Sequence, residues 1–196
     1  IEGEVIIKPK DCGDFTRLFP KEETVLDITR RKIANGERVL IYTSWTRTDS
    51  QKKLLKLLRE EGYRTEILTP QVPTEKREEW VDKRVKNGLQ VLITNPRCVE
   101  TGLDLNAFTT LIFYSMGYNL FTLRQASRRS WRINQTAPRV EVYMPFYVDT
   151  MQAKAMKLMA SKLAAAGMIE GSFSEEGLSA MSECEDMTTL MARELM

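Results

Sequence analysis

Short apolar runs separated by longer polar segments limit the fold of this chain more than any other feature. Val39–Thr43, Val91–Ile93 and Leu111–Tyr114 consist almost entirely of residues that favour buried strands. Strands that are apolar on both faces are typical of parallel sheets, because helices then cover each face. The sequence therefore predicts an α/β fold with a three-layer parallel sheet and helices on both faces.

The segments between these runs place apolar residues at helical spacing. Turn residues at Asn35–Gly36, Gly62 and Asn87–Gly88 are expected to end the helices that precede them. The predicted helices cover 21–35, a segment that starts at Asp49 or Ser50, 74–86, 121–132 and 150–166, and further strands are expected at 65–68 and 140–148. The expected division is an N-terminal tail over 1–20, one domain over 21–149 and a helical extension with an acidic end over 150–196.

Composition excludes several classes of function. The 196 residues include no histidine, and the three cysteines are far apart without CxxC spacing, so neither a zinc site nor histidine catalysis is expected. No signal peptide opens the chain and no apolar run reaches the ~20 residues of a membrane span, so we expect an intracellular protein, cytoplasmic or in the nucleoid or nucleus, with no membrane partner. Because the sequence begins at Ile1, we expect it to be a piece of a longer protein.

Arginines gather in one segment that contains no acidic residue. Between Leu105 and Val140 there is no Asp or Glu, and the basic residues there are all arginines, namely Arg124, Arg128, Arg129, Arg132 and Arg139. The planar guanidinium binds oxygen-rich anions at two points and stays charged at any working pH. This segment therefore predicts a phosphate-bearing partner.

Polar residues follow the predicted strands at the points where parallel sheets bind their ligands. Thr43 and Ser44 end the first strand, and a long loop with Thr94, Arg97 and Thr101 follows another. Hydroxyl, amide and guanidinium groups suit a phosphate backbone. We expect base-independent contact with nucleic acid at this edge; the hydroxyl in the second loop that meets the strand is Thr94 or Thr101, or the contact falls to the amide of Asn95.

Taken together, three segments resemble the second RecA-like lobe of superfamily-2 helicases and Swi/Snf-type translocases. Residues 125–135, QASRRSWRINQ, match the QxxxRxxRxxQ pattern of motif VI. Residues 91–105 are similar to motif V, and 39–44 with the helix that follows are similar to motif IV. The resemblance covers about 39–148, and it makes residues 1–20 the end of an interlobe linker.

The resemblance implies an ATP site shared between two lobes. Arg129 and Arg132 then occupy the positions of arginine fingers, with Gln125, Gly102 and Asp104 near the nucleotide. Thr43, Ser44 and Thr94 fall where the family contacts a nucleic-acid backbone. ATP and Mg²⁺ are bound mainly by the N-terminal RecA-like lobe of the same polypeptide, and the glutamine that ends motif VI favours DNA over RNA.

Two other readings remain open on the sequence. One is a non-hydrolysing nucleic-acid or protein docking module derived from such a lobe, and retention of both Arg129 and Arg132 argues against it. The other is the nucleotide-sugar half of a glycosyltransferase, which requires acidic residues where 105–140 has none. Because the chain contains neither GxxxxGK[ST] nor an acidic pair after an apolar strand, the fragment alone is expected not to hydrolyse ATP.

Overall fold

The computed structural model describes residues 17–44, 50–99, 103–115, 120–130 and 135–169. Five parallel strands form one sheet in the order β2-β3-β1-β4-β5. The strands are β1 Val39–Thr43, β2 Thr65–Leu68, β3 Val91–Thr94, β4 Thr110–Ser115 and β5 Glu141–Tyr143. The helices are α1 Pro20–Ala34, α2 Ser50–Glu60, α3 Arg77–Lys86, α4 Leu120–Arg128 and α5 Met151–Ile169, with short 3-10 turns at Thr74–Lys76 and Pro96–Val99.

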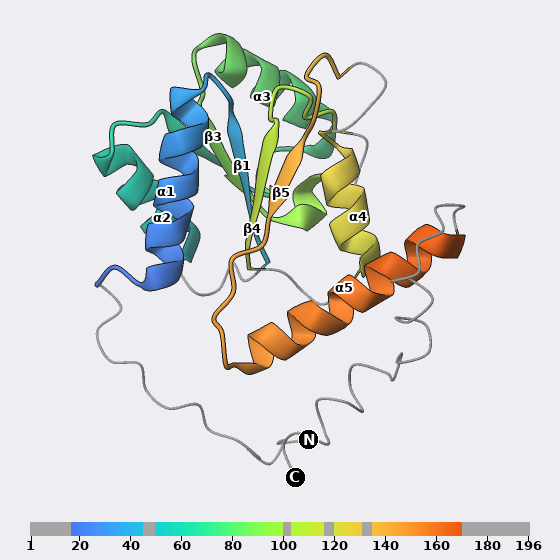
Figure 1. Ribbon diagram of the computed structural model, residues 1–196. Coiled ribbons are helices and arrows are strands. Elements are labelled where there is room, and N and C mark those ends of the chain that lie inside the picture. Colours follow the sequence, from blue (N-terminus) through green and yellow to red (C-terminus); the bar gives the residue numbers. More distant parts are fainter. Residues whose placement is uncertain (1–16, 45–49, 100–102, 116–119, 131–134, 170–196) are drawn as a thin grey trace, which may run out of the picture.

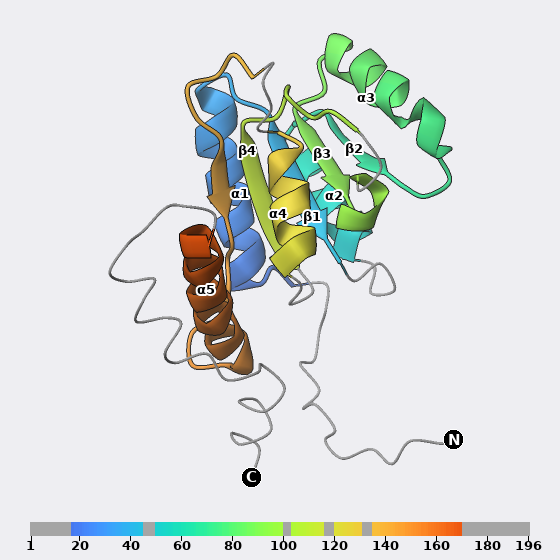
Figure 2. The same cartoon turned by 90° about the vertical axis from the view of Figure 1, so that its right-hand side faces the viewer.

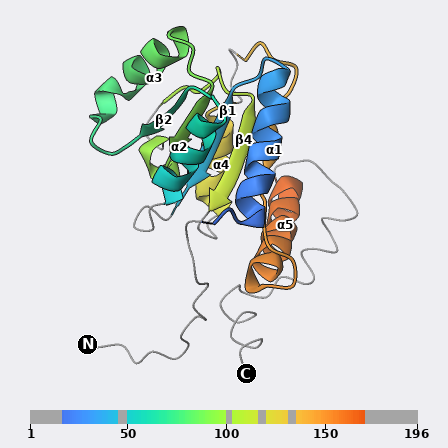
Figure 3. The same cartoon turned by 90° about the vertical axis from the view of Figure 1, so that its left-hand side faces the viewer.

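Alternation along the central strand divides the core between the two faces of the sheet. Val39 and Ile41 of β1 pack with α1 and α2 on one face, whereas Leu40 and Tyr42 pack with α3, α4 and α5 residues on the other. Figure 2 shows α4 in front of the sheet, and Figure 3 shows α1 and α2 covering the opposite face. The predicted three-layer α/β architecture is confirmed.

Glycines end the helices where the sequence predicts. Gly36 has φ 78°, a conformation that glycine adopts without a steric penalty, and the N–H of Glu37 donates to the carbonyl of Lys32 at 3.0 Å. Gly88 has φ 85° and follows α3 in the same way. These turns reverse the chain so that each following strand enters the sheet at the same edge.

Three predicted elements differ from those observed. The expected strand 140–148 is only Glu141–Tyr143, because Pro145 lacks an N–H group and the following Phe146, Tyr147 and Val148 are exposed. The predicted helix 74–86 begins as a 3-10 turn and becomes α-helical at Arg77.

The third difference concerns the helix that carries the arginines. The predicted helix 121–132 is described as α4, which ends at Arg128, and the N–H of Arg129 donates to the carbonyl of Ala126 at 3.3 Å in a tight turn. Arg129 therefore lies just beyond the helix, and its direction is set by the turn rather than by helical spacing.

Helix α5 belongs to the lobe through its apolar face. Ala155, Leu158 and Met159 are buried, and Met159 joins the core on the α4 side of the sheet. Figure 1 shows α5 crossing beyond the ends of the strands, next to α4. The methionine and alanine spacing of 151–159 thus indicates a packing face.

Candidate functional site

The carboxyl ends of three strands are tied into one surface by hydrogen bonds. The N–H of Ser44, directly after β1, donates to the carbonyl oxygen and to Oγ of Ser115 at 2.9 and 3.0 Å. The amide Nδ2 of Asn95, directly after β3, donates to the carbonyl of Ser44 at 3.2 Å. The loops expected to contact nucleic acid therefore start from adjacent, mutually fixed positions.

Two of the expected hydroxyls are turned into the protein. Thr43 and Thr94 are fully buried. Thr43 Oγ1 accepts a hydrogen bond from Gln51 Nε2 at 2.7 Å, and Thr94 Oγ1 donates to the carbonyl of Leu68 at 3.0 Å. We expected both to meet a phosphate backbone; in this structure their bonds hold strand ends and the start of α2.

Arg97 is the exposed cation of the second loop. Its N–H donates to Asn95 Oδ1 at 3.0 Å, which folds Pro96–Val99 back beside β3 and leaves the Arg97 side chain in solvent. Thr101 and Gly102 lie outside the described residues. Asn95 thus connects the exposed arginine to Ser44 on the neighbouring strand.

The arginine segment is anchored to the centre of the sheet. Tyr42 of β1 donates its hydroxyl to the carbonyl of Ala126 in α4 at 3.1 Å, and the N–H of Leu105 donates to the carbonyl of Arg129 at 2.9 Å. Burial raises the pKa of Tyr42, and the positive charge of Arg129 acts in the opposite direction. Tyr42 is therefore a neutral donor, and the predicted motifs V and VI meet at the Leu105–Arg129 contact.

Gln135, the glutamine that ends the motif VI pattern, holds main-chain groups in place, a role that the sequence analysis did not predict. Its Nε2 donates to the carbonyls of Asn106 and Ser130 at 3.0 and 2.7 Å, and its Oε1 accepts from the N–H of Ala137 at 3.0 Å. One amide thus fixes both sides of the segment 131–134. The glutamine at each end of the arginine run was the available signal, but spacing alone does not reveal which carbonyls it reaches.

The remaining predicted nucleotide residues are only partly described. Gln125 in α4 and Asp104 before the Leu105 contact are both half-buried. Arg132 lies outside the described residues, as does Gly102. The structure therefore brings Arg129 close to the segment that contains Asp104. The proposed role of Arg132, the second arginine of the expected pair, stays a prediction.

A buried carboxylate lies at the same edge, where α1 begins. Glu22 is 3% exposed, and its carboxylate receives an ion pair from Lys53 Nζ at 2.8 Å and hydrogen bonds from the N–H of Phe19 at 2.9 Å and the hydroxyl of Tyr114 at 3.4 Å. Three elements, α1, α2 and β4, therefore meet at one carboxylate. The acidic residue in the first turn of α1 also complements the helix dipole.

Lys21, next to Glu22 in the chain, is buried in aromatic surroundings. Its ammonium lies 5.2 Å from the ring centre of Tyr114 and 6.0 Å from that of Tyr147, and donates a long hydrogen bond of 3.5 Å to Gln152 Oε1. Burial lowers the pKa of Lys21 to about 8. The lysine thus joins α1 to the segment that leads into α5.

The described residues near the strand ends include cations and amides, which suit phosphate. Within those residues no group of three histidine, cysteine or carboxylate side chains is gathered. None of the helices in this part of the chain is long and apolar enough to cross a membrane. The groups at the carboxyl edge fit the phosphates of a nucleotide or of a nucleic acid.

Comparison with known proteins identifies the family of this chain. Residues 20–134 match the model of the helicase conserved C-terminal domain. The chain is 27% identical over 165 residues to the chromatin-remodeling ATPase INO80 of Mus musculus, covering 79% of this chain and 10% of that protein. It is 26% identical over 199 residues to the ATP-dependent DNA helicase DDM1 of Arabidopsis thaliana, covering 95% of this chain and 24% of that protein.

A solved structure shares the fold. The C-terminal part of the Fun30 ATPase domain superposes with a TM-score of 0.67 at 21% identity, over 75% of this chain and 47% of that one. The chain spans a tenth to a quarter of the length of the two relatives above. The family match over residues 20–134 includes four of the five strands, β1 to β4, together with α4 and Arg129. This chain therefore belongs to the helicase conserved C-terminal domain family, as the second RecA-like lobe of a Snf2-type superfamily-2 protein.

Proposed function

We propose that this lobe supplies arginine fingers to the ATP site of a DNA-dependent helicase or translocase. The proposal rests on two hydrogen bonds that anchor the arginine segment. The N–H of Leu105 donates to the carbonyl of Arg129, and the side-chain amide of Gln135 donates to the carbonyl of Ser130. A side chain that stabilises a transition state must be held before the reaction. Both bonds act on the main chain, so they fix the position from which the Arg129 side chain extends.

Arg129 and Arg132 then act on the γ-phosphate of ATP. Negative charge on the phosphoryl oxygens must be stabilised during transfer, and an arginine finger contributes a factor of ~10³ to 10⁵ to the rate. Gln125 orients the arginines, and Gly102 and Asp104 approach the nucleotide. ATP and Mg²⁺ are held mainly by the N-terminal RecA-like lobe, which supplies the phosphate loop and the metal ligand.

The nucleic-acid track runs over the loops after β1 and β3. We assign phosphate contacts to Ser44, Arg97 and Thr101, and we assign to Thr43 and Thr94 the role of fixing the strand ends beneath them. A direct phosphate contact by either buried hydroxyl requires it to leave its present partner. DNA is the proposed substrate because the relatives include a chromatin-remodeling ATPase and an ATP-dependent DNA helicase.

The test is DNA-stimulated ATP hydrolysis by the full-length protein. Arg129→Ala and Arg132→Ala should each lower kcat by a factor of ~10³ or more with an unchanged melting temperature. Arg128→Ala, which removes an exposed cation from the same segment, is the matched control and should retain turnover. Wild-type turnover in both finger variants would contradict the proposal and favour a docking module that does not use the fingers.

A further inference from the structure

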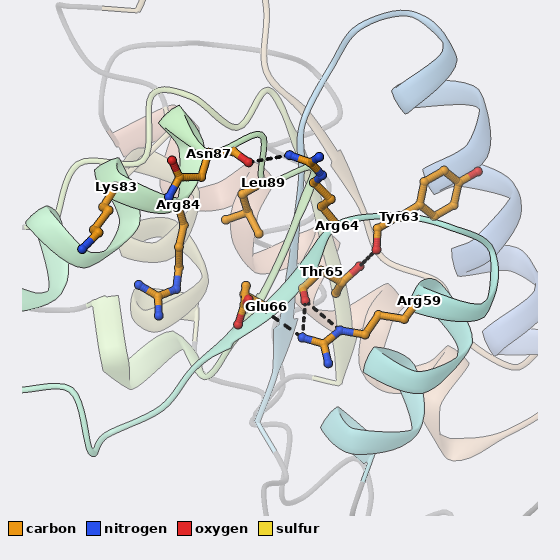
Figure 4. Close-up of a pocket in the computed structure, with 9 residues that line it drawn as sticks. All are labelled: Arg59, Tyr63, Arg64, Thr65, Glu66, Lys83, Arg84, Asn87 and Leu89. Atoms are coloured by element: carbon orange, nitrogen blue, oxygen red, sulfur yellow. Dashed lines mark hydrogen bonds and ion pairs between the residues drawn. The ribbon is translucent and has the colours of Figure 1, made fainter.

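A hollow of about 600 Å³ lies at the amino end of the edge strand β2, away from the loops discussed above. Helices α2 and α3 end on its two sides, and the turn Tyr63–Arg64 and the first residues of β2 form its floor (Figure 4). Its lining residues are Arg59, Tyr63, Arg64, Thr65, Glu66, Lys83, Arg84, Asn87 and Leu89. Among the described strands β2 pairs with β3 alone, so it forms one border of the sheet.

Positive charge dominates the hollow. Four of its lining side chains are basic, Arg59, Arg64, Lys83 and Arg84, and one is acidic, Glu66, which leaves three positive charges in excess. The acidic side chain approaches Arg59 only to 3.9 Å. Within the described residues the other three cations, Arg64, Lys83 and Arg84, have no ion pair, so an anion that enters the hollow meets an excess of positive charge.

The guanidinium groups are held in place by main-chain carbonyls. Arg59 donates from Nε and Nη2 to the carbonyl of Thr65 at 3.1 and 2.9 Å, and Arg64 donates from Nη1 to the carbonyl of Asn87 at 2.7 Å. Each guanidinium carries five N–H donors, so most donors of both residues remain for a ligand. Groups that are fixed before binding lose less entropy when the ligand arrives.

The other two cations come from the last turns of α3. Arg84 stacks on the ring of Trp80 at 3.4 Å and donates to the carbonyl of the same residue at 3.3 Å. Lys83 is exposed, and within the described part of the chain its ammonium makes no ion pair or hydrogen bond. Figure 4 shows the Lys83 and Arg84 side chains descending from α3 on the side opposite Arg59.

Helix dipoles explain only part of this cluster. Each helix end carries about half a negative charge, which favours basic residues in the last turns of α2 and α3. Arg64 belongs to neither helix, and two half charges do not balance three positive charges. The hollow therefore keeps a positive excess after the dipoles are counted.

We propose that this hollow binds phosphate groups of a nucleic-acid backbone, as a second contact separate from the loops after β1 and β3. The inference rests on the proposed function, since it assigns a further part of the same substrate. A polymer presents several phosphates that meet separate cations at once, and these cations come from three elements. No bare aromatic face lines the hollow in the described residues, because Arg84 covers Trp80 and the Tyr63 ring points away, so contact is with the backbone rather than the bases (Figure 4).

The experiment measures the affinity of this chain for a short labelled DNA duplex as a function of salt, by fluorescence anisotropy. Arg64→Gln/Lys83→Gln should weaken binding by about tenfold and reduce the slope of log affinity against log salt by about two. The matched control, Arg31→Gln/Lys157→Gln, removes the same charge from exposed positions on α1 and α5 and should leave both quantities unchanged. Lys83→Gln alone disturbs no internal hydrogen bond, so it provides the same test with a slope change of about one if the double variant is unstable.

Two further measurements separate the possible failures. If Arg97→Gln reduces the salt slope and Arg64→Gln/Lys83→Gln behaves like its control, the nucleic-acid track of the proposed function stands and the second contact is wrong. If Arg64→Gln/Lys83→Gln reduces the slope and Arg97→Gln does not, the contact at the hollow is supported and the Arg97 contact is rejected. Pyrophosphate is the probe for a small ligand. If the hollow variant loses pyrophosphate binding but keeps wild-type affinity for the duplex, the hollow takes a free phosphate compound and the nucleic-acid assignment is overturned.

Discussion

Each end of α1 has a buried lysine beside the sheet, and the groups that surround the two lysines differ. At the amino edge of the sheet, Lys32 is 10% exposed and its ammonium lies 3.1 Å from a carboxylate oxygen of Glu37 and 2.9 Å from one of Glu141. Glu37 also accepts from the hydroxyl of Thr110 at 2.8 Å. At the carboxyl edge the buried Lys21 faces tyrosine rings, and no carboxylate in the described residues pairs with it.

The pKa values of the two lysines record this difference. Burial acts to lower the pKa of Lys32, but its hydrogen bonds to Glu141 and Glu37 outweigh burial and raise it. Burial alone lowers the pKa of Lys21 to about 8. The charged form of Lys32 at the amino edge is therefore stabilised by its partners. The charged form of Lys21 at the carboxyl edge is destabilised by burial, and this lysine lies beside the loops assigned to ligands. Costs of this kind are concentrated at functional sites, because the ligand rather than the fold determines the residues there.

The largest stability effect should come from breaking the amino-edge network. Lys32→Met removes the cation between two carboxylates and should lower the free energy of unfolding by about 2 kcal/mol, measured by urea denaturation at neutral pH. Arg30→Met is the control, because Arg30 pairs with Asp27 and Glu61 in solvent and should change little. Equal losses in the two variants would show that the network adds nothing beyond an exposed ion pair.

Removing a hydroxyl should cost more at the carboxyl edge than at the amino edge. Tyr42→Phe removes the hydroxyl donor from the carbonyl of Ala126, which then keeps only the longer bond from the N–H of Arg129 at 3.3 Å. The free energy of unfolding should fall by about 1 kcal/mol. Tyr143→Phe is the matched control: its hydroxyl donates to Glu141 at 2.6 Å, but water can replace it at that half-buried position. A greater loss for Tyr143→Phe in the same urea titration would reverse the assignment of the buried tether.

Lys21→Met should stabilise the lobe by about 1 kcal/mol at pH 7, because it keeps the apolar stem and removes a buried charge. The folded pKa of about 8 lies below the ordinary 10.5, so the unfolded chain binds more protons between these values. The cost of Lys21 is therefore complete below pH 8 and is relieved as the pH rises toward 10.5. Urea midpoints of wild type and variant should converge over that range; a constant difference would point to packing rather than charge.

The smallest expected effect is on how the stability of the lobe depends on pH in the acid range. The hydrogen bond from Tyr143 and then that from Lys32 lower the pKa of Glu141 from 4.5 to about 2. A carboxylate with a lowered folded pKa stabilises above its unfolded pKa, and that contribution is lost as the pH falls from 4.5 to 2. Thermal melts of Glu141→Gln should therefore depend less on pH in this range than melts of wild type. Identical slopes would remove Glu141 from the network.

The sheet could be predicted from the sequence because strands that are buried on both faces consist of consecutive apolar residues. β1 and β2 match their predicted bounds, and the glycines after α1 and α3 have the expected positive φ. The length of β5 was overestimated, because apolar residues continue past Pro145 without belonging to the sheet. Hydrophobic runs thus report burial better than they report strand ends.

The site depends on pairings that a linear pattern does not contain. Lys32 and Glu141 are far apart in the chain, and Gln135 reaches back to Asn106. Thr94 was predicted correctly to lie at a strand end, but only packing decides that its hydroxyl turns toward Leu68. The positive charge of the arginine segment could be predicted from the sequence. The hydrogen bond from Leu105 that holds Arg129 could not, because it depends on how the chain folds.

Our proposal that Arg129 acts on ATP while the Lys32 network maintains the fold is tested by comparing two variants of equal charge change in the full-length protein. Arg129→Gln and Lys32→Met are compared for DNA-stimulated kcat below both melting temperatures and for the melting temperature itself. We expect Arg129→Gln to lose a factor of ~10³ in kcat at an unchanged melting temperature, and Lys32→Met to melt at a lower temperature with wild-type kcat. Retained turnover in Arg129→Gln, or an equal loss of turnover in Lys32→Met, would contradict it.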